Sequence, residues 1–130
     1  MHWFGSLENP QAVSSLFTEI DALSMVELHE VVAHRDGPVV RIRFDVQLVP
    51  RALPRSWPTD ANTTQITLAA WGVEELLLNG WGTSNLGRLS VEREGTAQVL
   101  SFVGGPCKLK ARHSLLRVER IQGYVKQRDG

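Results

Sequence analysis

The chain has 130 residues, and its 14 basic and 14 acidic side chains give a formal net charge of zero at pH 7. Proteins that bind nucleic acid usually need a basic surplus to neutralise phosphates, so this balance argues against a nucleic-acid partner. The hydrophobic fraction is 42%, and a chain of this length can bury a real core, so we expect one domain over residues 1–130. A local basic patch stays open at residues 108–112.

The first predicted element is a helix that starts at Asn9 and Pro10, with asparagine as the cap and proline at the first helical position. Apolar residues then recur at helical spacing: Val13, Leu16, Phe17 and Ile20. The helix should therefore run to about Ala22 and should be the only substantial helix of the chain. We expect Val13, Phe17 and Ile20 to pack on a sheet.

The rest of the chain has the pattern of short β-strands. Arg35-Asp-Gly-Pro38 is typical of a hairpin turn, and the following strand alternates apolar residues with Arg41, Arg43 and Asp45. That alternation predicts one buried face and one solvent-exposed face. The strands are expected at residues 25–34, 40–48, 64–71, 73–78, 88–94, 98–103, 107–112 and 116–125. The sequence thus predicts an α+β fold of mostly antiparallel β structure, with the helix packed on a curled sheet or a two-sheet sandwich of about eight strands.

The segment from Gly82 to Leu89 comes close to two motifs, a phosphate loop and a nucleophile elbow, and lacks residues that each one needs. Gly82 to Gly87 has the glycines of a phosphate loop, but Arg88 and Leu89 follow where the lysine, the hydroxyl and a helix are needed. Ser84 also lacks the second glycine of a nucleophile elbow. We therefore interpret this segment as a connection between strands.

The histidines and the cysteine give no assembled site either. His29 and His34 are five residues apart, and this spacing makes them diverge on a helix and point to opposite faces of a strand. Cys107 and His113 would share one face of a strand, but roughly 20 Å apart. Cys107 is better explained as a small core residue. We predict no metal, nucleotide or flavin cofactor.

The chain also carries no sign of export. The single cysteine cannot form an internal disulfide, the N-terminus lacks a signal-peptide pattern, and no apolar run approaches the ~20 residues that span a bilayer. These features favour a cytoplasmic protein with no membrane partner.

The four tryptophans are informative because large aromatic side chains either fill a core or anchor a partner. Trp71 and Trp81 stand beside glycine turns, where we expect them to cover the core. Trp57 lies in a proline-rich loop, residues 50–62, and Trp3 lies near the N-terminus. Plugging of the sheet is the favoured role for these two, since most large aromatics are largely buried.

Several segments occur in an order that resembles the immunity protein 50 family of bacterial polymorphic toxin systems. They are Trp3-Phe4, Glu8-Asn9-Pro10, "LHEVVAHRDGPVVRIRFDV", the proline-rich loop, "LAAWGVEELLLNGW" and "LLRVERIQGY". The resemblance covers most of the chain. It implies a small cytoplasmic protein that protects its producer by binding a cognate toxin, and it supplies no catalytic residues.

Two other functions stay open from the residues alone. One is an enzyme whose site assembles from dispersed residues such as Arg41, Asp45, His113 and Glu119. The other is a small-ligand-binding β domain with a pocket lined by tryptophan. A tight protein complex would appear with the product of the neighbouring gene, whereas an enzyme would show a concave cluster of shifted titratable groups.

If the chain binds a toxin, a few arginine and aromatic anchors should carry most of the binding energy. The segments richest in such anchors are the row Arg41, Arg43 and Asp45 and the proline-rich loop that follows this strand. In the loop the candidate contacts are Arg51, Arg55 and Trp57. We predict that the row and the loop form one partner-binding face.

Overall fold

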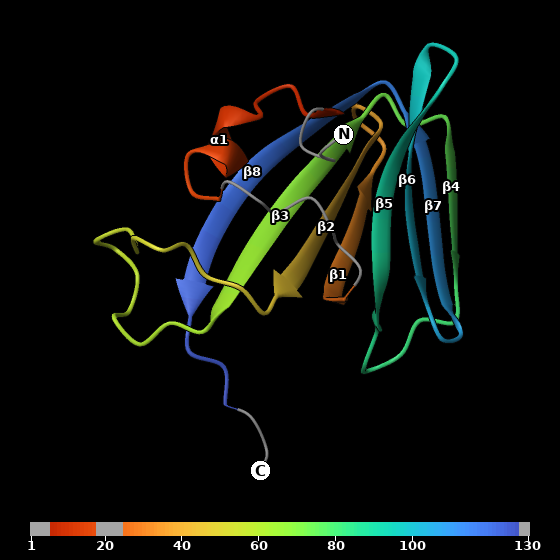
Figure 1. Ribbon diagram of the computed structural model, residues 1–130. Helices are drawn as coiled ribbons and strands as arrows, with labels where there is room; N and C mark the ends of the chain where they lie inside the picture. The colour runs from red at the N-terminus through yellow and green to blue at the C-terminus, as the bar shows by residue number, and fades with distance from the viewer. Residues whose placement is uncertain (1–5, 18–24, 128–130) are drawn as a thin grey trace.

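The computed structural model describes residues 6–17 and 25–127, and its main feature is an eight-stranded sheet (Figure 1). One short helix, α1 (Gln11–Ser14), precedes the strands. The strands are β1 (Val26–His34), β2 (Val39–Val46), β3 (Thr63–Trp71), β4 (Glu75–Asn79), β5 (Leu86–Glu94), β6 (Ala97–Gly104), β7 (Cys107–His113) and β8 (Leu115–Tyr124). They lie in the order β4-β7-β6-β5-β1-β2-β3-β8, and every pair of neighbouring strands is antiparallel. The predicted fold class is confirmed.

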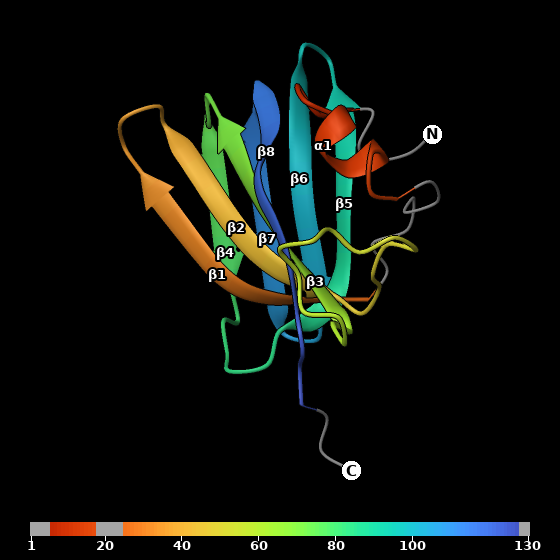
Figure 2. The same ribbon diagram turned by 90° about the vertical axis from the view of Figure 1, so that its left-hand side faces the viewer.

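The sheet bends back on itself between β5 and β1, where only Val26–Gly87 and Glu27–Leu86 are paired. We call β1, β2, β3 and β8 the first half, and β4, β5, β6 and β7 the second half. Figures 1 and 2 show the two halves as separate walls, with α1 beside β8 of the first half. One core cluster contains side chains from both walls, including Ile42, Phe44, Leu100 and Phe102. Of the two predicted arrangements, a strongly curled sheet describes the molecule.

Strand β2 shows how the alternating sequence sets the two faces of the first half. Val40, Ile42 and Phe44 are buried in the core, and the residues between them point to the other side of the sheet. We call that other side the outer face. Arg41 and Arg43 lie on it and are half-buried, as the alternation predicts.

The N-terminal helix is shorter than predicted within the described residues. It ends at Ser14, and a turn carries the chain on to Phe17. Val13 and Phe17 are buried in the core as expected, whereas Ile20 and Ala22 lie outside the described residues. The predicted asparagine cap is wrong, because the Asn9 side chain makes no capping bond to the helix and instead bonds to Val118 of β8.

The segment before α1 covers the edge of β8. The Asn9 side chain donates to the carbonyl of Val118 and accepts from its N–H, both at 2.9 Å. The N–H of Glu8 donates to the carbonyl of Leu116 at 2.7 Å, and Leu7 forms a parallel bridge to the same residue. Gln98 of β6 donates to the carbonyl of Ser6 at 3.1 Å. These bonds tie the second half to the first across the open side of the fold.

The glycine-rich segment between β4 and β5 is a connection between strands, as predicted. Asn85 closes it: its amide accepts from the N–H of Gly82 at 3.0 Å and donates to the Gly82 carbonyl at 2.9 Å. The same amide donates to the carbonyl of Leu28 at 3.3 Å, which ties the connection to β1. The side chain is buried, so these bonds replace water that it cannot reach.

We expect Asn85→Ala to lower the free energy of unfolding by about 2 kcal/mol, because it removes three hydrogen bonds, one of them to the buried carbonyl of Leu28. Ser84→Ala is the matched control, since Ser84 is an exposed neighbour and surface changes of this kind stay within about 0.5 kcal/mol. Chemical denaturation of both variants measures the difference. Equal stability of the two variants would contradict the role given to Asn85.

Candidate partner-binding face

The outer face of the first half gathers most of the charged and polar side chains that the strand register aligns. Its members are Glu27, His29, Glu30, Arg41, Arg43, Asp45, Gln65, Arg117, Glu119, Arg120, Gln122 and Tyr124, with Lys126 following β8. Opposite charges pair between the neighbouring strands β1 and β2 and also, across β3, between β2 and β8. Three of these groupings define its geometry.

Arg41 is fixed from two sides. Its Nε donates to Glu119 Oε1 at 2.5 Å and its Nη2 donates to Glu119 Oε2 at 3.3 Å, which is a bidentate pair between β2 and β8. The guanidinium also lies 5.4 Å from the ring centre of Trp71, within cation–π distance. The hydrogen bond to Glu119 raises the pKa of Arg41. Its planar group is therefore oriented before any partner arrives.

Arg43 is about as accessible as Arg41, with 36% and 35% of the two side chains exposed. Its Nη2 lies 3.3 Å from Glu30 Oε2 on β1, and about half of the Glu30 side chain is exposed. An exposed pair of this kind contributes little to stability, typically below about 1 kcal/mol. Its charges are therefore available to a partner at small cost to the fold.

Asp45 does not lie in a solvent-exposed row, and this part of the sequence prediction is wrong. Its residue exposure is 3%. Its carboxylate accepts from His29 Nε2 at 2.7 Å, from Gln65 Nε2 at 3.0 Å and from the hydroxyl of Tyr124. The alternation correctly placed Asp45 on the outer face, but side chains of β1, β3 and β8 cover it there.

Burial alone would raise the pKa of Asp45, but the hydrogen bonds donated by Tyr124, Gln65 and His29 outweigh it and hold the pKa below its ordinary value. The pKa of Tyr124 is raised, first by burial and then by its bond to the Asp45 carboxylate. Asp45 is therefore a charged anchor that orders its neighbours. It is saturated with donors and is poorly placed to act as a general base.

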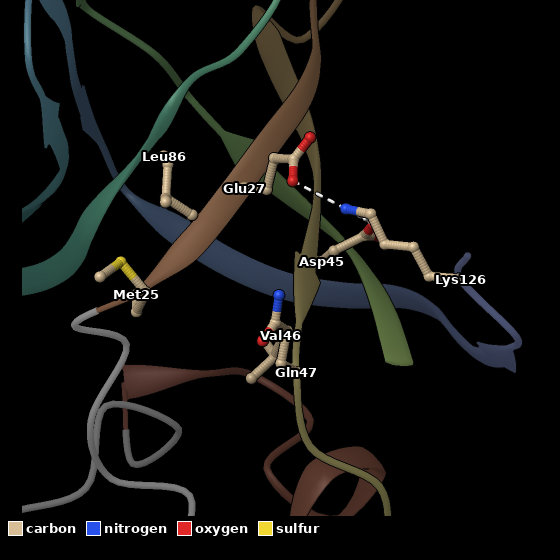
Figure 3. Close-up of a pocket in the computed structure, with 7 residues that line it drawn as sticks. All are labelled: Met25, Glu27, Asp45, Val46, Gln47, Leu86 and Lys126. Atoms are coloured by element: carbon tan, nitrogen blue, oxygen red, sulfur yellow. Dashed lines mark hydrogen bonds and ion pairs between the residues drawn. The ribbon is translucent and has the colours of Figure 1, made fainter. Parts of the chain in front are cut away.

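A cavity of about 400 Å³ opens at the end of β1 and β2 beside this network (Figure 3). Lys126 Nζ donates to Glu27 Oε2 at 2.7 Å and lies 3.5 Å from Asp45 Oδ2. The bond to Glu27 raises the pKa of Lys126, so the ammonium is the stable form here. Met25 and Leu86 form an apolar wall across from these charges. Among the described residues, no tryptophan lines this cavity.

The proline-rich loop does not join the arginines of β2 in one face. Trp57 packs against Gly123, and a Cβ at Gly123 would lie only 2.1 Å from its ring. Gly123 pairs with Thr64, two positions from the core residue Ile66 on the same side of the sheet. Trp57 is therefore on the core side, and Figures 1 and 2 show the loop on the same side as α1. Its exposure is 9%, as the plugging role predicts, while Arg51 and Arg55 are exposed.

The dispersed residues of the enzyme alternative do not come together. His113 is buried on the core side of β7, where Nδ1 lies 3.0 Å from the Ala111 carbonyl and Nε2 lies 3.2 Å from Gln98 Oε1. Arg41, Asp45 and Glu119 lie on the outer face of the other half. Among the described residues, no group of three or more histidine, cysteine or acidic side chains could hold a metal ion.

Two further side chains differ in how well the sequence predicted them. Cys107 is a buried core residue, as expected. Trp81 is exposed, so the expectation that it covers the core is wrong. The sequence did not predict the residues that surround Asp45, and among them Gln65 and Tyr124 reach it because β3 pairs with β2 and β8 pairs with β3. No local motif indicates that meeting, since it depends on the order of strands in the sheet.

Comparison with known proteins decides the family. The family described as immunity protein 50 matches residues 9–124. The chain belongs to the immunity protein 50 family. The resemblance drawn from the sequence is thereby confirmed over nearly the whole described fold. Searches of curated proteins and of solved structures gave no match. In the part of the chain that the structure describes, no helix is long and apolar enough to cross a membrane.

Proposed function

We propose that this immunity protein 50 family member binds a cognate bacterial toxin domain and neutralises it by occlusion, without catalysis of its own. The family match over residues 9–124 carries the proposal. The geometry supports the proposal, because the outer face presents ordered charged groups that a protein partner could contact. The contacts described above include no exposed nucleophile that is paired with a base. We further propose that it acts in the cytoplasm of the producing cell.

The outer face is the surface we assign to the toxin. Arginine anchors are common among the residues that dominate interfaces, and an anchor that is already ordered loses less conformational entropy on binding. Arg41 is held by Glu119 and Trp71, and Arg43 stands beside Glu30 with both side chains accessible. In this assignment the buried Asp45 holds neighbouring side chains of the outer face in place through its hydrogen bonds, whereas Trp57 stabilises the fold.

Growth protection tests the proposed function. The toxin encoded beside this chain should stop growth when it is expressed alone, and co-expression of the chain should restore growth. The two proteins should also co-purify in a fixed ratio. Failure of protection by a folded, well-expressed chain would contradict the proposal.

The assigned surface predicts a change in association rate. Arg43→Glu puts like charges beside each other at Glu30 and should slow association with the toxin about tenfold at low salt, because rim charges act mainly on encounter. The salt dependence of the rate should change as well. Stopped-flow mixing measures both.

Arg88→Glu is the matched control. This exposed arginine is on β5 of the second half, and its replacement should leave the association rate unchanged within about twofold. Equal slowing in both variants would indicate a general charge effect and would remove the assignment.

A further inference from the structure

Strand β4 is an edge strand with one paired side. In the described part of the chain it pairs only with β7, from Glu75 opposite Arg112 to Asn79 opposite Lys108. Figure 1 shows β4 as the outermost strand of the second half. The opposite edge of the sheet, β8, is covered by residues 7–9 through backbone and side-chain hydrogen bonds. In the described part of the chain, the β8 edge of the sheet is therefore covered, whereas the β4 edge is open.

The residues of β4 are unusual for an open edge. Its sequence is Glu-Leu-Leu-Leu-Asn, and all five residues are exposed. Leu77, at 51% exposure, lies directly opposite the exposed Lys110 of β7 and points to the outer side of the second half. Leu76 and Leu78 point to the inner side, opposite the core residues Ala111 and Leu109, yet both stay exposed. Proteins usually protect an open edge with lysine, proline or a bulge, and β4 has none of these in its span.

We propose that a second copy of this chain pairs with β4 in antiparallel orientation, with Leu77 of each copy opposite Leu77 of the other. This register follows from the symmetry of the strand sequence. Leu76 of one copy meets Leu78 of the other on the inner side, and the two Leu77 side chains meet on the outer side. Every exposed apolar residue of the strand then gains an apolar partner, and the unpaired backbone groups of both edges are satisfied together.

The charges near the edge favour the same arrangement. Antiparallel pairing places Glu75 opposite Asn79 of the second copy, whose neighbour on β7 is Lys108. Glu75 of one copy, Asn79 of the other copy and Lys108 of that other copy then lie in one row across the strands. The negative charge of Glu75 therefore approaches the positive charge of Lys108. Parallel pairing in register would instead place Glu75 beside Glu75, and like charges directly opposite are destabilising. The two-fold antiparallel pair is an isologous contact and closes as a dimer.

Dimerisation through β4 uses none of the outer-face residues defined above, although the curled sheet brings Glu75 and Leu76 to a cavity that Ala33 and His34 of β1 also line. Each copy can therefore bind one toxin, and dimerisation and toxin binding are separable. The inference does not rest on the proposed function.

Light scattering after size exclusion, over a range of concentrations, tests the dimer. The unmodified chain should have the mass of a dimer, while Leu77→Lys and Leu77→Glu should each weaken dimerisation about tenfold or more by opposing like charges at the symmetry axis. Mixing the two variants should restore the dimer, because lysine then meets glutamate. Val103→Lys is the matched control: Val103 is equally apolar, 55% exposed and on β6 of the same half, away from the edge.

A cross-link provides a second measurement that does not depend on a destabilising change. Leu77→Cys should form a disulfide between copies under mild oxidation, whereas Val103→Cys should not; the native Cys107 is buried and should stay reduced. A monomeric mass for the unmodified chain at all concentrations would overturn the proposal. A dimer that persists in Leu77→Lys would also overturn the proposal. The same holds for a Leu77→Lys chain that keeps the mass of the unmodified chain and loses only toxin binding.

Discussion

Replacing Trp57 with alanine should lower the free energy of unfolding by about 3 kcal/mol or more, the largest effect we expect from a single change in the proline-rich loop. The ring is buried at 9% exposure and packs against Gly123 of β8. Removing it opens a cavity between the loop and the first half of the sheet. Arg55→Ala, an exposed residue of the same loop, should stay within about 0.5 kcal/mol of the unmodified chain.

The contact with Gly123 can be tested directly with a double-mutant cycle. Gly123→Ala places a Cβ about 2.1 Å from the Trp57 ring and should be destabilising by itself. On the Trp57→Ala background that Cβ has the space left by the ring, so the second change should cost much less. Additive effects of the two changes would contradict the packing described for this loop.

The same variant separates the two roles considered for Trp57. If the ring is a core residue, folded Trp57→Ala should bind the toxin with unchanged affinity, although its melting temperature falls. A normal melting temperature with an affinity loss of about 2 kcal/mol would instead identify the ring as an anchor of the interface. Thermal unfolding and toxin titration on one preparation distinguish these outcomes.

Replacing Asp45 with asparagine should lower the free energy of unfolding at neutral pH by about 3 kcal/mol. The carboxylate accepts hydrogen bonds from His29, Gln65 and Tyr124, and it faces the ammonium of Lys126. An asparagine amide turns one acceptor into a donor and removes the charge, so several donors lose their partner in a buried site.

The pH dependence of this difference has a defined sign. The pKa of Asp45 lies below its ordinary value of 3.8, because its three hydrogen-bond donors outweigh the opposing effect of burial. A carboxyl with a depressed pKa contributes stability above its unfolded pKa, and this contribution is lost as the pH falls through its folded pKa. The gap between the unmodified chain and Asp45→Asn should therefore be constant above about pH 5 and shrink as the pH falls below about 4.

Asp60→Asn is the control for this titration, since Asp60 is an exposed carboxylate in the proline-rich loop. It should change stability by less than about 0.5 kcal/mol over the same pH range. Urea denaturation at a series of pH values measures all three chains. A gap between the unmodified chain and Asp45→Asn that widens toward low pH would show that the carboxylate is not held in its charged form.

Much of the fold follows from local pattern in the sequence. The alternation in β2 predicts that Ile42 and Phe44 are buried and that Arg41 and Arg43 lie on the opposite face, and both are observed. Asn9 shows the limit of this reasoning. Its position before the helix is typical of a cap, but the side chain forms two hydrogen bonds with Val118, more than a hundred residues away. Tertiary contacts outweigh a local preference here.

The candidate site depends on strand order, which periodicity does not encode. Asp45 was expected in an exposed row, because alternation assigns a face and does not reveal what covers it. Tyr124 and Gln65 cover Asp45 because β3 and β8 follow β2 in the sheet. The proline-rich loop was expected on the same face as Arg43, whereas the missing side chain at Gly123 lets Trp57 pack on the core side.

Direct titration of the purified chain with its proposed cognate toxin domain tests the central proposal. The unmodified chain should bind in a one-to-one ratio and abolish toxin activity in the same concentration range, and Arg41→Glu/Arg43→Glu should weaken binding at least about tenfold while the chain remains folded. Arg51→Ala/Arg55→Ala, on the loop side, should bind as the unmodified chain does. Absence of binding by the unmodified chain would contradict the immunity function, and full affinity of the Arg41→Glu/Arg43→Glu variant would contradict the outer face as its site.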